Sequence, residues 1–187
     1  MAAIINLPAE QVEQICAEAA QGEVCQAANL NSPEQIVISG SKAAVERAAA
    51  LAKQRGAKRA LILPVSAPFH CALMQPAQDR LAADLCALSF HNPEVPVICN
   101  VDAAQVATGD QSRDALIRQV TGAVQWVKSM RALIELGVQN YVEVGPGKVL
   151  CGLMKQIDKS RSCVNVQDED SLQKAVNHFS VASAHPE

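Results

Sequence analysis

The residue best suited to chemistry in this sequence is a histidine that follows a loop punctuated by prolines. His70 lies within LPVSAPFHCALM (63–74), between a predicted strand and the first turn of a predicted helix. Pro64 and Pro68 restrict the backbone of that loop, so they favour a fixed position for an exposed imidazole. An imidazole with an ordinary pKa of about 6.5 can act as a general base near neutral pH. A helix-start histidine that makes only a capping contact is the alternative.

Two other segments carry weaker chemical signals. Ser66 lies in the same loop, but no G-x-S-x-G elbow surrounds it, so we expect a turn residue rather than a nucleophile. The segment 141–153, YVEVGPGKVLCGL, predicts a buried strand, a glycine turn and a helix start. Such a backbone can approach an anionic or thioester group closely. A purely structural turn between strand and helix explains the same pattern.

Polar and basic side chains in the first third of the chain indicate two candidate binding surfaces. Asn29 and Asn31 place two carboxamides on one face of an extended segment, where they can donate to an acyl carbonyl or a phosphate. An asparagine-rich turn is the alternative. Between residues 41 and 59, six basic residues face one acidic residue, which indicates either an acidic protein partner or an ordinary solvated helix face. The candidate docking residues are Lys42, Arg47, Arg55, Lys58 and Arg59.

The elements predicted for residues 1–64 form one compact topological unit. Short apolar runs alternate with helical stretches in the order β-α-β-β-α-β, which is the ferredoxin-like arrangement. Pro8 suits a first helical turn, Asn31-Ser32-Pro33 suits a hairpin turn, and Gly56 suits a helix C-terminus. The predicted strands are 2–7, 24–30, 35–39 and 59–65, and the predicted helices are 8–20 and 41–55.

After residue 64 the pattern changes to longer helices separated by single strands. Alternation of this kind favours parallel pairing in an α/β layer. Three strands make a thin sheet with open apolar edges, so we expect this part to be a piece of a larger sheet. The predicted helices are 70–88, 110–120, 126–136, 148–157 and 171–178, the strands are 96–100, 141–144 and 163–166, and residues 180–187 are expected to fray.

Composition excludes several classes of protein. A length of 187 residues suits one domain or one domain with a small lobe, and 49% hydrophobic residues argue against disorder. With 3% aromatic residues and a net charge of −3, the chain lacks the stacking groups and basic field of nucleic-acid binders. The seven cysteines include no C-x-x-C pair, which argues against a metal site or a disulfide framework. We therefore expect reduced thiols and a cytoplasmic location. We expect neither a signal peptide nor a membrane span.

Four segments together resemble one family. LPVSAPFHCALM, NLNSPEQIVISG, IRQV with AVQW, and YVEVGPGKVL are similar, in order and spacing, to the bacterial malonyl-CoA:acyl carrier protein transacylases of fatty-acid biosynthesis. The resemblance extends from Met1 to Leu153. It implies a ferredoxin-like small subdomain over residues 1–64 and, over residues 65–187, the C-terminal portion of an α/β-hydrolase-like acyltransferase core.

The resemblance also implies roles for particular residues. In this family a serine takes malonyl from coenzyme A and passes it to the phosphopantetheine thiol of acyl carrier protein, without a cofactor. His70 matches the catalytic histidine, and the backbone carbonyl of Gln119 matches the group that orients it. Phe69 resembles the bulky residue that accompanies selection of malonyl over larger acyl groups. Phe69 from the resemblance, and Asn29 and Asn31 from the residue pattern, are the substrate-binding candidates.

Three family motifs are missing from this sequence. The G-H-S-x-G-E elbow with the nucleophile, the G-Q-G-S-Q turn and the malonate-binding arginine after the elbow do not occur among its 187 residues. We therefore expect a fragment that is inactive alone and pairs with a chain supplying the N-terminal half. The alternatives are a non-catalytic module that docks acyl carrier protein, and a truncated product with no function of its own.

Overall fold

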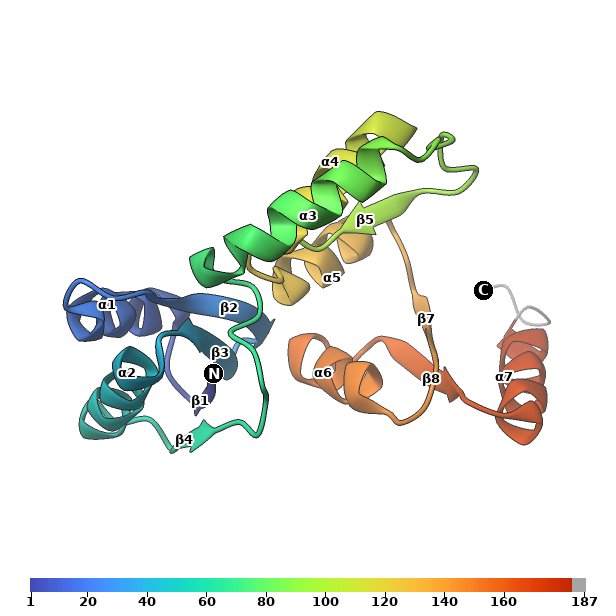
Figure 1. The fold of residues 1–187 in the computed structure, drawn as a ribbon. Helices are drawn as coiled ribbons and strands as arrows, with labels where there is room; N and C mark the ends of the chain where they lie inside the picture. The colour runs from blue at the N-terminus through green and yellow to red at the C-terminus, as the bar shows by residue number, and fades with distance from the viewer. Residues whose placement is uncertain (183–187) are drawn as a thin grey trace. The chain divides into compact units, whose positions relative to one another are not determined.

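A computed structural model describes residues 1–182 of the protein (Figure 1). The chain forms two compact units, one over Met1–Leu133 and one from Ile134 onward. The domain boundary that we predict after residue 64 lies inside the first of these units. It is based on the order of helices and strands and not on compactness, and it stays a prediction. No helix in the described part is long and apolar enough to cross a membrane.

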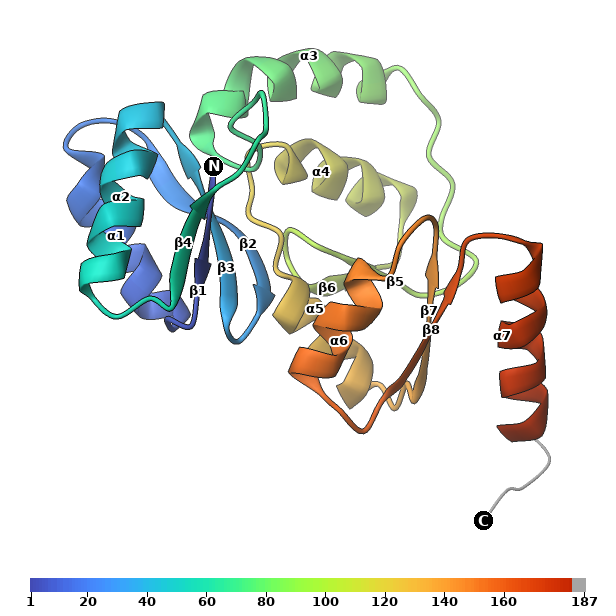
Figure 2. The same ribbon diagram turned by 90° about the horizontal axis from the view of Figure 1, so that it is seen from below.

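The first unit begins with the predicted βαββαβ order. Its four-stranded antiparallel sheet has the strand order β2-β3-β1-β4, and Figure 2 shows both helices on one face of this sheet. The mixed α/β fold class and this element order are confirmed. The elements are β1 (Ala2–Ile5), α1 (Ala9–Ala20), β2 (Cys25–Ser32), β3 (Gln35–Gly40), α2 (Lys42–Gln54) and β4 (Arg59–Ile62).

The core of this sheet is built from isoleucines on the strands and small residues on the helices. On the strands, Ile4, Ile36 and Ile38 are each at most 2% exposed, and on α1 Ile15 is 1% exposed. Alanines line the buried face of α2, and their small side chains let α1 and α2 pack closely against each other and the sheet. Burying each isoleucine contributes about 1.5–3 kcal/mol relative to leaving it exposed.

The hairpin turn between β2 and β3 differs from the predicted one. Strand β2 continues through Ser32, so the turn is formed by Pro33 and Glu34 instead of by residues 31–33. The amide of Glu34 donates to the Ser32 hydroxyl over 3.3 Å, which closes the turn one residue later than expected. The pairing of β2 with β3 is irregular at Ala28 and Asn31, so simple alternation does not hold across Asn31.

The rest of the first unit is mostly helical. Its two short strands pair antiparallel with each other, whereas the sequence predicted a parallel α/β layer, and the second of them was not predicted at all. The helix predicted over 70–88 starts late, because His70 itself has a left-handed backbone. The elements are the 3₁₀ turn η1 (Ala72–Met74), α3 (Gln75–Cys86), β5 (Val97–Cys99), β6 (Ala104–Val106), α4 (Gly109–Gln119) and α5 (Trp126–Glu135).

The second unit contains one parallel strand pair and two helices. Strands β7 (Asn140–Val144) and β8 (Ser162–Val166) pair in parallel, with α6 (Val149–Ile157) between them in the chain and α7 (Glu169–Ala182) after them. Parallel pairing is therefore confirmed here. The predicted three-stranded sheet is wrong within the described residues, because the strand at 97–99 pairs with 104–106 instead. Helix α7 includes residues 180–182; the rest of the segment expected to fray lies outside the described residues.

A disulfide joins Cys151 on α6 to Cys163 on β8. The expectation of reduced cysteines throughout is wrong for this pair. A crossover helix lies against the strand that follows it, so two cysteines 12 residues apart meet without any local motif. The other five cysteines of the described chain are free, and no group of three or more metal-ligating side chains occurs among these residues.

Candidate active site

His70 is held by the backbone of a residue 49 positions further along the chain. Its Nδ1 lies 3.0 Å from the carbonyl oxygen of Gln119, the last residue of α4. A carbonyl oxygen only accepts, so Nδ1 must carry the proton and donate it. The half-buried imidazole then has its Nε2 available as the basic nitrogen. The structure thus brings together the two residues that the family resemblance pairs.

The backbone around His70 is left-handed and is fixed by two hydrogen bonds. His70 adopts φ 57°, a left-handed conformation that costs a non-glycine residue about 1–2 kcal/mol. The fully buried thiol of Cys71 donates to the carbonyl of Pro68 over 3.1 Å, and the amide of Ala72 donates to Oε1 of Gln26 over 3.2 Å. These bonds tie the loop to itself and to strand β2. Sequence reasoning did not identify Gln26, because its only signal is a tertiary contact.

The Gln119 side of the site is a tight turn that requires glycine. The Gln119 side chain donates from Nε2 to the carbonyl of Gly122 over 2.9 Å, which closes the turn after α4. A Cβ at Gly122 would lie 2.7 Å from Val101 Cγ2 and 2.8 Å from the carbonyl oxygen of Arg118. In the same turn, the Thr121 hydroxyl donates to Oε1 of Gln78 on α3 over 2.6 Å. The acceptor carbonyl is therefore placed by neighbours on both sides.

An ion pair that sequence reasoning missed also anchors the end of α4. Arg118 donates to both carboxylate oxygens of Asp102, at 2.7 and 2.6 Å, and to Asp114 at 2.7 Å. The hydrogen bond from Arg118 holds the pKa of Asp102 below its ordinary value. Asp114 and Arg118 have the i,i+4 spacing of helix ion pairs, which is a local signal; Asp102 gives none.

The loop before His70 borders a hollow of about 480 Å³ in the first unit. Ser66, Ala67 and Pro68 line it together with Lys42 of α2 and Leu73 of η1. Phe69, immediately before His70, is 42% exposed. The hollow is lined by residues on both sides of Phe69 and His70 in the chain but by neither of these two, so the substrate-binding role of Phe69 stays a prediction.

The two candidate asparagines lie in different surroundings. Asn29 forms a parallel bridge with Val124, and that segment follows the Gln119 turn. The flanking bonds are Val124 N to Ala28 O at 2.8 Å and Leu30 N to Val124 O at 2.9 Å. The backbone of Asn29 therefore lies beside the segment that carries the acceptor carbonyl. Asn31 lies at the strand irregularity, and a binding role for both carboxamides stays a prediction.

The basic residues of the predicted docking surface fall into two groups. Arg47 donates to the carbonyls of Ala19 and Ala20 and to Glu23, and Arg55 pairs with Glu18, so both half-buried arginines stabilise α1 from the side of α2. Lys42, Lys58 and Arg59 are exposed. The structure thus leaves three of the five residues as candidates for a partner, while the other two have structural contacts.

The glycine turn at 145–147 does not present an open anion site. The Glu143 carboxylate accepts from the amides of Leu150 and Cys151 over 3.0 and 2.8 Å, so the protein's own carboxylate occupies the N-terminus of α6. The amide of Gly147 donates to Gln167 over 3.0 Å. These contacts favour the structural interpretation of this segment over the anionic or thioester one.

Three observations define the class of protein: the α/β fold, the histidine that is oriented by a main-chain carbonyl, and a match to one protein family. The family described as "Acyl transferase domain" matches residues 1–179, and the chain belongs to this family.

Within that family the similar proteins are malonyl CoA-acyl carrier protein transacylases. The chain is 54% identical to that of Escherichia coli K12 over 157 residues, covering 84% of this chain and 51% of the relative. It is 41% identical to that of Bacillus subtilis, covering 94% and 56% respectively. The chain thus spans about half the length of the curated relatives that it matches.

Solved structures agree with this relationship. The Coxiella burnetii transacylase superposes with a TM-score of 0.92 at 44% identity, covering 94% of this chain and 56% of the other. A malonyl-transacylase in complex with a type II polyketide synthase acyl-carrier protein gives the same TM-score and identity, covering 95% and 57%. The α/β acyltransferase fold is therefore established for this chain.

Proposed function

We propose that this chain carries the general base for transfer of a malonyl group from coenzyme A to the phosphopantetheine thiol of acyl carrier protein. The observation that carries the proposal is the 3.0 Å contact between His70 Nδ1 and the carbonyl of Gln119, which leaves Nε2 as the base. The names of the relatives supply the substrate class, since they are malonyl CoA-acyl carrier protein transacylases.

Nε2 of His70 would move one proton in each half of the reaction. It first takes the proton of a serine hydroxyl as that oxygen attacks the malonyl thioester carbonyl, and it returns this proton to the departing thiolate of coenzyme A. It then takes the proton of the phosphopantetheine thiol, which attacks the malonyl ester, and returns it to the serine. The G-H-S-x-G-E motif is not in these 187 residues, so the proposed reaction takes its serine from outside them.

The remaining residues have supporting roles in this proposal. Phe69, Asn29 and Asn31 would contact the acyl group. Exposed Lys42, Lys58 and Arg59 would attract the acidic carrier protein. Arg47 and Arg55 would attract it less, because their charges are already paired with Glu23 and Glu18. Malonyl-CoA enters as a substrate, and the reaction as written uses no cofactor. We propose the cytoplasm as its location, because five of the seven cysteines are free.

Complementation tests the proposal. The chain is assayed for malonyl transfer alone and after mixing with the part of the Escherichia coli transacylase that it does not match. We expect transfer only in the mixture, and we expect His70→Ala to lower it by about 10²–10⁴-fold because a general base contributes that much. A mixture whose rate is unchanged by His70→Ala would remove this residue from the mechanism. Exposed Cys86→Ser is the matched control and should leave the rate unchanged.

A non-catalytic docking module is the second candidate, and the exposure of Lys42, Lys58 and Arg59 favours it. In that case the chain binds acyl carrier protein in a salt-sensitive way and stays inactive in every mixture. Reversing the charge of Lys58 and Arg59 should then weaken binding of the carrier protein. Equal binding of the reversed variant would exclude docking through these residues.

A further inference from the structure

Two free cysteines lie together in the first unit, next to Gln26, whose side chain bonds to the loop of His70. Cys16 lies on α1, and Cys25 is the first residue of β2. Cys16 belongs to the buried core of the first sheet, and Cys25 packs against that core. They line a hollow of about 310 Å³ together with Glu13, Ala17, Gln26 and Ala27.

The two thiols have different environments. Cys16 is 2% exposed, and the neighbouring Cys25 thiol together with burial raises the pKa of its thiol. Cys25 is half-buried, and the neighbouring Cys16 thiol and the charge of Arg47 lower its pKa against the opposing effect of burial. Cys25 is therefore the thiol that ionises first, and Cys16 is the protected thiol behind it.

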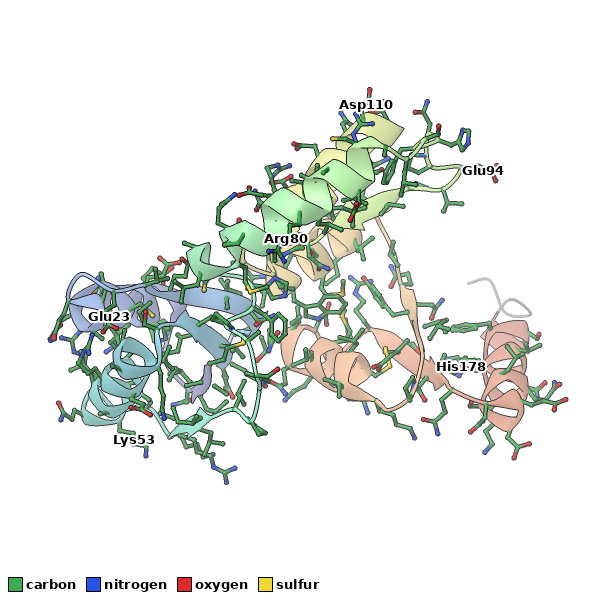
Figure 3. The ribbon with its side chains drawn as sticks, viewed as in Figure 1. Glu23, Lys53, Arg80, Glu94, Asp110 and His178 are labelled. Atoms are coloured by element: carbon green, nitrogen blue, oxygen red, sulfur yellow. A yellow bond between two sulfur atoms is a disulfide. The ribbon has the colours of Figure 1, made fainter. Side chains whose placement is uncertain are left out.

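The positive charge beside Cys25 is fixed in place. Arg47 donates to the carbonyls of Ala19 and Ala20 at 2.9 and 3.1 Å and to Glu23 at 2.7 Å. Figure 3 labels Glu23 beside α1, at the end of the first unit where α1 is followed by β2. Three hydrogen bonds keep the guanidinium near the junction of α1 and β2, where its charge lowers the pKa of the Cys25 thiol although Glu23 shares that charge.

The other cysteines do not share this arrangement. Cys71 is fully buried and donates to a carbonyl, and Cys151 and Cys163 are already bonded to each other. Cys86 is exposed on α3, and Cys99 contacts the carboxylate of Asp102. Within the described chain, Cys16 and Cys25 are the two free cysteines that line one hollow together.

We propose that Cys16 and Cys25 form an oxidisable dithiol that reacts with low-molecular-weight disulfides. The Cys25 thiolate attacks one sulfur of the small disulfide, a mixed disulfide forms, and one small thiolate leaves and takes up a proton. Cys16 loses its proton and attacks the Cys25 sulfur, which breaks the mixed disulfide and releases the second small thiol. The protein gains a Cys16–Cys25 disulfide and loses two hydrogens, which the reagent gains.

Glutathione disulfide is the probe for this reaction. The chain is incubated with it, remaining thiols are blocked with N-ethylmaleimide, and peptides are identified by mass spectrometry. We expect a Cys16–Cys25 cross-linked peptide in the wild type. Cys16→Ala should instead accumulate glutathione on Cys25, because the resolving thiol is missing, and Cys25→Ser should form neither product. Cys86→Ser is the control and should behave as the wild type.

Two results would overturn the proposal. One is a Cys16→Ala variant that gains no glutathione on Cys25 while its circular dichroism matches that of the wild type. The other needs no variant: alkylation of the wild type by iodoacetamide at neutral pH should modify Cys25 about tenfold faster than Cys86, because the thiolate is the reacting form. Equal or slower modification of Cys25 excludes it as the attacking thiol, even where the variants do not fold.

Discussion

The sheet β2-β3-β1-β4 and the strand pair β7–β8 are two ways in which strands and helices combine in this chain. In the first, α1 and α2 cover one face, and the isoleucines of the strands are buried beneath them. In the second, two parallel strands carry Val142 and Val144, which are 47% and 81% exposed. Parallel sheets are normally covered on both faces, and two strands rarely persist alone.

This difference shows which strands of the described chain bury their apolar side chains and which leave them exposed. The first sheet completes a recognised topology from residues 1–62 and buries its own core. The parallel register places Val142 beside Val164 and Val144 beside Val166, an apolar ladder of a kind that proteins usually bury. The relatives are about twice as long as the stretch that this chain matches. The strands β7 and β8 therefore lack the covering layers that a parallel sheet normally has, which is consistent with the complementation that we propose.

The largest expected effect comes from breaking the core of the first sheet. Ile38 is fully buried, so Ile38→Ala should lower the free energy of unfolding of the first unit by about 2–5 kcal/mol. Val144→Ala is the matched control in the second unit and should change stability by no more than about 0.5 kcal/mol because it is exposed. In urea unfolding, fluorescence of Trp126, the one tryptophan of the chain, reports the first unit, and fluorescence of Tyr141, the one tyrosine, reports the second. Equal effects of the two substitutions would contradict the comparison.

The disulfide offers a second test, in the opposite region. Cys151 and Cys163 close a loop of 12 residues, and loss of a cross-link of that size costs about 3 kcal/mol. Cys163→Ala should therefore destabilise the second unit, which the single tyrosine, Tyr141, reports by fluorescence, while the Trp126 signal stays unchanged. Cys86→Ser is the control for removal of a cysteine. A shift in the tryptophan transition as large as that of the tyrosine would show that the units do not unfold separately.

The same contrast explains what the sequence could and could not predict. Residues 1–62 were predicted well, because Pro8, Gly56 and alternating apolar residues are local signals that agree with the tertiary packing. Strand β6 was missed because Ala104–Val106 is too short to show alternation. The start of α3 was misplaced because the left-handed backbone of His70 depends on contacts with distant residues.

The family resemblance predicted more of the candidate site than the residue pattern alone did. His70 was identified from its loop, but only the family resemblance paired it with Gln119, since a main-chain acceptor has no signature in residue types. Gln26, Gly122 and Asp102 were missed, because each acts through a tertiary contact with a partner far away in the sequence. Cys151 and Cys163 were missed for the same reason.

The smallest expected effect compares one aspartate from each unit under acid conditions. Hydrogen bonds from Arg118 lower the pKa of Asp102 in the first unit, and those from Ser171 lower the pKa of Asp168 in the second. A carboxyl whose pKa is lower in the folded state stabilises the fold above its unfolded pKa of about 3.9. That contribution disappears as the pH falls from this value through the folded pKa.

Asp102→Asn should therefore reduce the stability of the first unit at pH 7 and flatten its loss below about pH 4, whereas Asp168→Asn should do so only in the second unit. The effects should be small, because exposed pairs are screened by solvent. Urea titrations between neutral and acid pH, followed through Trp126 and Tyr141, separate the two units. An Asp102→Asn variant could instead be destabilised equally at every pH. That result would show that Asp102 acts through packing at the end of α4 and that its charge does not help to hold Arg118.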